Sequence, residues 1–310
     1  MAAAVRTDGE HGVAGERQHL TSLAYRLLGS LTEAEDAVQE TYARWYGLSP
    51  RQRQDVEVPA AWLTTVAGRI CLDLLRSARV RRERYVGVWL PEPLPGAGQR
   101  LGHAADGTDP ADRVALDESV HMAFLVLLES VTPAERVAFV LHDVFRYSFA
   151  EIADVVGRTP AACRQLAASA RRRVRAAQPG PAAADSTAPT AAAAQQAARI
   201  KEFQQAWQAK DIAALVGLLD PGAVMTTDGG GLAGANARPV EGGERIAQYL
   251  VHFVDRAPGL ALEVRTVNGQ PGLVARHAGT TVSVAAFAFT GDGRISEIWT
   301  VRNPEKLTAW

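Results

Sequence analysis

Six arginines and no acidic residue lie in the stretch VGRTPAACRQLAASARRRVR, residues 156–175. Arginine can pair with guanine and glutamine with adenine in the DNA major groove, and further arginines can bind phosphates. We therefore expect this segment to bind DNA through Thr159, Ala161, Arg164, Gln165, Arg171 and Arg172. The alternative is a solvated basic face that only complements the dipole of its helix.

The residues around this stretch predict a helix-turn-helix. Ser148 and Glu151 have the spacing of a capping box, and Gly157 would end the first helix. Thr159 can cap the second helix, with Pro160 at its first position. Cys163, Leu166, Ala167 and Ala170 recur at helical spacing and would face the core.

An acidic cluster occurs near the N-terminus. Glu33, Glu35, Asp36 and Glu40 stand on one expected helix, with no cation before Arg44 in that segment. Such a face would repel DNA and attract a basic protein surface. A plain solvated helix end is the alternative.

A third group mixes an aromatic side chain with cations. Trp62, Thr65, Arg69 and Arg76 lie on one face of the helix expected at 59–84. This combination suits separated DNA strands, whose bases stack and whose phosphates pair with arginine. Trp62 as a core residue is an equally open reading.

Helical periodicity predicts the elements that carry these groups. The expected helices are 15–29, 32–47, 59–84, 116–129, 133–146, 148–156 and the arginine-rich stretch. Gly/Pro-rich and Ala/Pro-rich segments read as linkers, the second covering 176–196.

After residue 196 the pattern changes to that of an α+β unit with a curved antiparallel sheet. One amphipathic helix, 198–219, comes first and a second helix is expected near 243–255. The expected strands are 223–227, 260–267, 272–277, 281–289 and 294–302, and TGDGR at 290–294 would join the last two as a hairpin.

Net charge, cysteine content and apolar runs limit the classes of function that this chain can have. The net charge of the 310-residue chain is −1, with 22 Arg/Lys against 22 Asp/Glu up to residue 175 and 11 against 12 after it. Nucleic-acid affinity must therefore come from local patches. The two cysteines, Cys71 and Cys163, have no companion at metal-ligand spacing, so we expect reduced buried thiols, no metal and no cofactor. Without an apolar run of signal-peptide or membrane-spanning length, a cytoplasmic protein is expected.

The residues resemble a known family, the bacterial extracytoplasmic-function (ECF) sigma factors of the SigJ type, which carry a C-terminal SnoaL-like domain. LTSLAYRLLGSLTEAEDAVQETYARW and PAAWLTTVAGRICLDLLRSARVRRER look like sigma region 2, and residues 128–174 look like region 4. WLPEPL, DGGG and NPEKL are similar to signatures of the SnoaL-bearing subgroup. The resemblance implies two all-α sigma domains followed by an α+β cone.

The resemblance also implies partners. They are the core RNA polymerase, through its β′ clamp and β flap, and promoter DNA; the chain is expected to be a monomer when free. The acidic helix would dock on the β′ clamp, and the helix-turn-helix would read the −35 element. The helix from 59 and the loop RQRQDVEVP before it would recognise the −10 element, with one base turned out into a loop pocket. Many relatives carry Asn where Arg69 stands, which leaves the −10 preference open.

The three signatures suggest regulation in cis. Glycines in DGGG allow close backbone approach, and the proline-held strip WLPEPL presents apolar side chains that need a partner surface. We expect the SnoaL-like unit to grip the strip and regulate the sigma domains. The residues involved would be Trp89, Leu90, Pro91, Glu92, Pro93, Leu94, Asp228, Gly229, Gly230, Gly231, Asn303, Pro304, Glu305, Lys306 and Leu307.

The expected domains are 14–88 (region 2), 89–115 (linker with WLPEPL), 116–177 (region 4), 178–195 (Ala/Pro linker) and 196–310 (SnoaL-like domain). Two other functions compete with a sigma factor: a one-component DNA-binding regulator with a small ligand in its cone, and an isomerase or hydrolase. Catalysis would draw on Asp228, Glu263, His277 or Glu297, which show no recognisable paired spacing, so we expect no enzyme.

Overall fold

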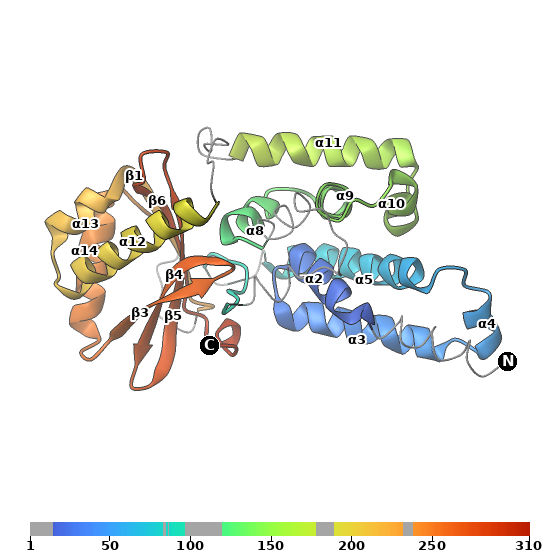
Figure 1. Cartoon of the computed structure of the whole chain (residues 1–310), viewed down its shortest axis with the longest axis horizontal. Helices are drawn as coiled ribbons and strands as arrows, with labels where there is room; N and C mark the ends of the chain where they lie inside the picture. The colour runs from blue at the N-terminus through green and yellow to red at the C-terminus, as the bar shows by residue number, and fades with distance from the viewer. Residues whose placement is uncertain (1–14, 83–84, 86, 97–119, 178–188, 232–237) are drawn as a thin grey trace. The chain divides into compact units, whose positions relative to one another are not determined.

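The computed structural model describes residues 15–82, 85, 87–96, 120–177, 189–231 and 238–310 (Figure 1). These residues form two compact units. Unit 1 contains 15–82 and 127–177, and unit 2 contains 85–96, 120–126 and 189–310. Residues 97–119 and 178–188, which include most of both expected linkers, lie outside the described residues.

The first half of unit 1 consists of α2 (Arg17–Leu28), α3 (Leu31–Gly47), α4 (Pro50–Gln54) and α5 (Pro59–Arg82). Three of these match the expected helices. The short α4 corrects the expectation of a loop over 51–59: Ser49 and Gln52 form a capping box and Pro50 occupies the first helical position, so a helical turn begins there.

The second half contains α9 (Pro133–Phe139), α10 (Phe149–Val156) and α11 (Pro160–Ala177). The helix α8 (Met122–Leu128) belongs to unit 2 up to Val126 and to unit 1 from Leu127. The helix expected over 133–146 is regular only to Phe139 and continues as one π-helical segment, Val140–Val144. The helix-turn-helix forms as expected. Ser148 and Glu151 cap α10, Gly157 ends it with a φ of 70°, and Thr159 accepts from the Ala162 amide at the start of α11.

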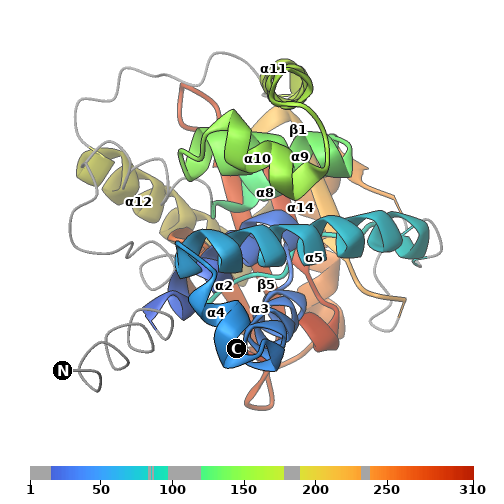
Figure 2. The same cartoon turned by 90° about the vertical axis from the view of Figure 1, so that its right-hand side faces the viewer.

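Apolar packing and buried polar contacts hold unit 1 together. The helices α9 and α10 pack against α5, and Figures 1 and 2 show them beside it. Arg136 on α9 is buried, donating to the Leu128 carbonyl at 3.0 Å and the Leu27 carbonyl at 3.0 Å. Tyr147 pairs its hydroxyl with His19 and Thr64. The two halves therefore share one packed interior.

Unit 2 is built from helices on a six-stranded sheet. The helices are α12 (Pro189–Gln208), α13 (Ile212–Leu218) and α14 (Gly243–Arg256). The strands are β1 (Leu219–Asp228), β2 (Val240–Glu241), β3 (Ala261–Val267), β4 (Gln270–His277), β5 (Thr280–Phe289) and β6 (Ile295–Val301), in the order β2-β1-β6-β5-β4-β3. A short 3-10 helix, Pro304–Lys306, follows β6.

Three expectations for unit 2 are corrected. The sheet is mixed because β1 pairs with β6 in parallel, which no local pattern reveals. The helix expected over 198–219 is two helices, since Lys210 has a φ of 57° and Asp211 caps α13. The first of them begins at Pro189, inside the expected linker, where alanines favour helix and proline suits its first turn.

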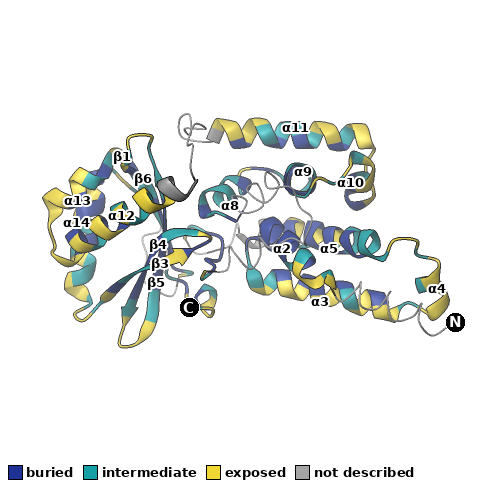
Figure 3. Cartoon of the chain, in the orientation of Figure 1, coloured by how far each residue is buried: buried dark blue, intermediate teal, exposed yellow. Residues whose placement is uncertain are grey.

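The two faces of the sheet bury different clusters, as strand alternation requires. Leu273, Ala275, Phe287 and Ile298 face the helices. Val274, Val284, Trp299 and Val301 face the other way, packing with Leu90, Met122 and Leu307. Figure 3 shows buried residues along the strands of this sheet. Among the described residues, we find no helix with the length and apolar character to cross a membrane.

Candidate functional sites

The expected DNA-reading residues of α11 lie mainly on an open surface. Thr159, Ala161, Arg164, Gln165 and Arg172 are exposed, whereas Cys163, Ala167 and Ala170 are buried beneath them. Arg171 is half-buried, and its Nε donates to Asp143 Oδ1 at 2.7 Å. The outward groups are thus arranged along one side of a helix whose other side is core.

Two further arginines of this region have partners within unit 1. The Arg164 guanidinium lies over the Phe149 ring at 5.2 Å, and Arg173 forms an ion pair with Glu135 at 3.5 Å. These contacts fix the side chains without covering them, because Arg164 and Arg173 remain exposed.

The aromatic and basic residues of α5 face α10. Trp62, Thr65 and Arg69 line a pocket of about 360 Å³ together with Tyr147 and Asp154. Arg69 Nε and Nη2 donate to the Asp154 carbonyl at 3.1 and 2.8 Å. Two turns further along, Arg76 is exposed and forms an ion pair with Asp73 at 3.1 Å. In this conformation, three of the four residues expected to read the −10 element lie against the helix-turn-helix half of unit 1.

Trp62 has a structural role as well. Its ring meets Trp45 of α3 edge to face, with centroids 5.2 Å apart, and it is half-buried. Both cysteine thiols are free and buried. Burial raises the pKa of Cys71 to about 12, because it disfavours the charged thiolate. These are the reduced thiols expected from the sequence.

The acidic cluster lies along the outer side of α3. Glu35, Asp36 and Glu40 are exposed and Glu33 is half-buried. Glu40 forms an ion pair with Arg44 at 2.9 Å. Tyr42 and Tyr46 stack nearby, and Tyr46 is 59% exposed, so an apolar ring adjoins the acidic surface.

In unit 2 the three signature motifs meet at one buried carboxylate, Asp228. Its Oδ2 accepts from the Leu90 amide of WLPEPL at 2.9 Å and from Lys306 Nζ of NPEKL at 2.7 Å. Its Oδ1 accepts from the Gly230 amide at 3.1 Å and from the Tyr85 hydroxyl at 2.6 Å. We call Asp228 and these four donors the motif cluster.

The motif cluster is buried and electrostatically paired. Asp228 is fully buried, and the Lys306 side chain is only 12% exposed. Lys306 Nζ also donates to the Leu90 carbonyl at 2.5 Å and lies over the Trp89 ring at 4.1 Å. Burial, together with the hydrogen bond to Asp228, raises the pKa of Tyr85 and keeps its hydroxyl a donor.

Close backbone approach explains one glycine of DGGG. Gly230 has a φ of 60°, and a Cβ there would lie 2.7 Å from Asn303 Cγ. Asn303 in turn donates from Nδ2 to the Tyr85 hydroxyl at 3.0 Å and accepts from the Glu305 amide at 3.1 Å. Only a residue without a side chain fits between β1 and the start of NPEKL.

The strip WLPEPL is fixed at its other end by residues outside the motifs. Asn268 exchanges two hydrogen bonds with the backbone of Leu94, and the Trp310 indole donates to the Pro93 carbonyl at 2.8 Å. Leu90, Pro91, Glu92, Pro93 and Leu94 are all buried. Sequence reasoning missed Tyr85, Asn268 and Trp310; the positive φ of 51° at Asn268, in an Asn-Gly turn, is the one signal that could have pointed to a special position.

The candidate catalytic groups do not converge. Asp228 is committed to the motif cluster, Glu263 pairs with Arg265 at 2.8 Å, and burial raises the pKa of Glu297. His277 lines a pocket together with His252 and Arg256. In the described part of the chain, no group of three or more His, Cys, Asp or Glu could hold a metal ion.

Comparisons with known proteins give consistent results. Models of sigma-70 region 2 and sigma-70 region 4 match residues 13–81 and 121–174. The chain is 39% identical over 303 residues to the ECF RNA polymerase sigma factor SigJ of Mycobacterium tuberculosis, covering 94% of this chain and 91% of SigJ. It is 32% identical over 292 residues to the probable ECF sigma factor SigI of the same species, covering 94% and 92%. The crystal structure of SigJ superposes with a TM-score of 0.70 at 35% identity, covering 95% of this chain and 96% of that one.

Proposed function

Since the chain belongs to the extracytoplasmic-function family of RNA polymerase sigma factors, we propose how its parts divide the recognition of a promoter. The family binds core RNA polymerase and promoter DNA. Membership confirms the sequence prediction of a sigma factor rather than an enzyme, and of two sigma domains followed by a SnoaL-like unit. It favours neither the one-component regulator nor the isomerase.

Region 4 would read the −35 element through α11. The support is the row of exposed residues from Thr159 to Arg172 at the N-terminal and middle turns, with the capping residues holding the helix start in place. Arg171 would contribute to phosphate binding only if it exchanged Asp143 for DNA, because its Nε is already paired. Arg172 is the better candidate for a phosphate contact.

Region 2 would read the −10 element through α5 and contact polymerase through α3. Stacking with bases and pairing with phosphates would come from Trp62, Thr65, Arg69 and Arg76. The β′ clamp would contact the carboxylates of Glu35, Asp36 and Glu40. Because Arg69 is bonded to the Asp154 carbonyl, α5 and α10 must separate before the −10 surface is fully available. Region 4, once released, would bind the β flap, and we expect the chain to be a monomer when free.

For the domains we propose the limits expected from sequence, 14–88, 89–115, 116–177, 178–195 and 196–310, although 85–96, 120–126 and 189–195 pack with the SnoaL-like unit. Residues 120–126 contact the SnoaL-like unit through Asn268 Nδ2, which donates to the Val120 carbonyl at 2.8 Å, so the region 4 boundary has a structural tie to that unit. Polymerase works on chromosomal DNA, and we accordingly place the site of action in the cytoplasm.

The SnoaL-like unit would regulate the sigma domains by holding the strip between them. The observation that carries this proposal is the burial of WLPEPL against the motif cluster, where DGGG and NPEKL converge on one carboxylate. A segment held by a buried charge and by hydrogen bonds at both ends restricts the chain that joins region 2 to region 4. Such a restriction would set how readily α5 and α10 separate.

Run-off transcription with purified core polymerase tests this regulation. The full chain is compared with a chain ending at residue 195 and with Gly230→Val, whose side chain would collide with Asn303. Gly259→Val is the matched control, because Gly259 has a similar positive φ of 85° but no atom within 4 Å of its Cβ position. We expect the first two changes to alter transcript yield and the control to leave it unchanged. Equal yield from all four proteins would refute regulation in cis, whereas the sigma activity itself would stand.

A further inference from the structure

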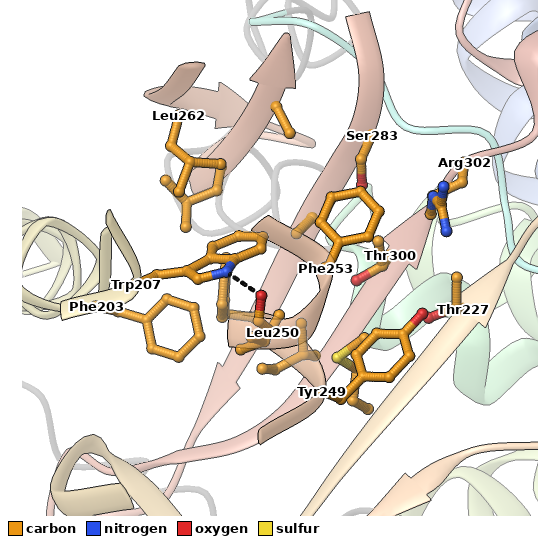
Figure 4. A pocket seen from close by; sticks show the side chains of 16 residues that line it. Phe203, Trp207, Thr227, Tyr249, Leu250, Phe253, Leu262, Ser283, Thr300 and Arg302 are labelled. Atoms are coloured by element: carbon orange, nitrogen blue, oxygen red, sulfur yellow. Dashed lines mark hydrogen bonds between the residues drawn. The ribbon is translucent and has the colours of Figure 1, made fainter. Parts of the chain in front are cut away.

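Unit 2 contains a cavity on the face of the sheet that carries α12 and α14 (Figure 4). Its wall is mainly aromatic and aliphatic, with Phe203, Trp207 and Phe287 among the lining residues. The Trp207 indole donates to the Leu250 carbonyl at 2.7 Å, so its single N–H group is used within the wall. On the other side of the view lie the hydroxyl residues Thr227, Ser283 and Thr300, and Arg302.

Arg302 is the one cation of this cavity among the described residues. Its backbone amide donates to the Asp228 carbonyl, which fixes the Cα, and its guanidinium lies over the Phe253 ring at 4.6 Å. Its Nε is buried and has no hydrogen-bond partner among the described residues. A buried donor without an acceptor costs free energy, and native structures seldom leave one unless a ligand or water completes it.

A second, larger space, which we call the mouth, shares lining residues with this cavity. Tyr249, Phe253 and Arg302 line both spaces, and the mouth adds His252, Arg256 and His277. The mouth measures about 700 Å³ and the inner cavity about 30 Å³. Neither lining includes an aspartate or glutamate among the described residues. The entrance is therefore basic and the interior apolar, with Phe253 between them.

We propose that this pocket binds a small amphiphilic anion, a monocarboxylate with an apolar body of up to about ten carbon atoms, a size within the range of small-molecule sites. The carboxylate would accept from Arg302, in a charge-assisted contact that satisfies the orphaned Nε. The apolar body would lie along Phe253 in the larger space, which measures about 700 Å³. The inner cavity of about 30 Å³ has room for little more than a water molecule and would not hold the body.

The position of the pocket gives such a ligand contact with residues next to the motif cluster. Thr227 directly precedes Asp228, and Arg302 directly precedes Asn303. The side chains of Thr227 and Arg302 line the cavity, whereas Asp228 and Asn303 bond to Tyr85. Binding itself does not rest on the regulatory proposal and can be tested without polymerase.

Isothermal titration calorimetry on the full chain tests the proposal. The probes are octanoate and naphthalene-2-carboxylate, each compared with the alcohol of the same carbon skeleton, octan-1-ol and 2-naphthalenemethanol. A hydrogen bond to a charged group predicts that each carboxylate binds about 10- to 100-fold more tightly than its alcohol. Arg302→Met keeps the apolar stem, and we expect it to reduce each carboxylate to the affinity of its alcohol.

Arg265→Met is the matched control, since Arg265 is an exposed arginine of β3 that lines neither space. It should leave all four affinities unchanged. Equal affinity of carboxylates and alcohols, an equal loss in both arginine variants, or no binding of either carboxylate would overturn the proposal. The comparison of head groups on the unsubstituted chain decides the matter even if Arg302→Met fails to fold, which far-ultraviolet circular dichroism would reveal.

Discussion

At the scale of single residues, Asp228 makes more hydrogen bonds than its surrounding sequence suggests. A fully buried carboxylate is tolerated only when it is paired and hydrogen-bonded, and this one accepts from two backbone amides, a tyrosine and a lysine. The three glycines that follow Asp228 in the sequence indicated that this position is special. It could not indicate Lys306 as the partner, because the two are 78 residues apart and no local pattern links them.

Local signals at residue scale were reliable where the interaction is local. Ser148, Glu151, Gly157 and Thr159 occupy the capping positions that their spacing predicts, because a cap bonds within three residues of itself. Arg171 and Arg69 show where local signals fail, because their partners belong to other elements. Helix packing determines that these partners are Asp143 and the Asp154 carbonyl, and no local sequence pattern predicts that packing.

Removing Lys306 should loosen the strip. The Lys306→Met variant keeps an apolar side chain at this position but leaves the buried Asp228 charge without its cation. Removing one partner of a buried ion pair typically lowers the free energy of unfolding by about 3–5 kcal/mol. The matched control is Lys210→Met, whose ion pair with Asp255 is about half exposed on both sides, so we expect a loss of about 0–1 kcal/mol. Hydrogen exchange at the Leu90 amide, which donates to Asp228, reports the change locally. Equal exchange in both variants would contradict the electrostatic account of the motif cluster.

At the scale of elements, the sequence predicted those whose periodicity is long and regular. Helices α2, α3 and α5 and strands β3 to β6 lie close to their expected positions. The errors come from short-range competition or from tertiary pairing. Lys210 adopts a left-handed backbone conformation and so interrupts a continuous amphipathic pattern. Strand β1 pairs in parallel with β6, a contact that depends on the tertiary fold and on no local pattern.

The contact of α5 with α10 depends on the absence of a side chain at Gly68. A Cβ at this position would lie 2.7 Å from Val155 Cγ1, a β-branched side chain that cannot swing away. Gly68→Ala gains up to about 1 kcal/mol of helix propensity but should lose about 1–3 kcal/mol through overpacking. In a Val155→Ala background the collision is absent, and the same substitution should stabilise.

Chemical denaturation of the four proteins of this cycle, followed by circular dichroism, measures the two effects. Gly47→Ala serves as the control, because its Cβ would meet no atom within 4 Å. A change of the same sign and size for Gly68→Ala in both backgrounds would mean that α5 and α10 do not pack closely in solution. That result would also remove the structural reason for a covered −10 surface.

At the scale of the whole molecule, charge balance and composition predicted the class of protein better than its internal contacts. A net charge of −1 with small basic patches fits a factor that depends on a larger partner for affinity. The division into helical and α+β parts followed from the change of periodicity near residue 196. That the strip 89–94 folds with the C-terminal unit could be stated only as a hypothesis, because it rests on contacts across more than a hundred residues.

The same charge balance predicts how the chain behaves without polymerase. Because acidic groups balance the basic ones and Arg69 and Arg171 are already bonded, duplex promoter DNA should bind the isolated chain weakly and without sequence preference, with a Kd of about 10⁻⁴ to 10⁻⁶ M near physiological salt. Adding core polymerase should make binding tight and promoter-specific, because α3 then supplies a docking surface and both reading helices act together. Fluorescence anisotropy of a labelled promoter fragment, measured with and without core and against a scrambled fragment, distinguishes the two states. Tight, sequence-specific binding by the chain alone would instead favour a one-component regulator and would contradict the requirement for a partner.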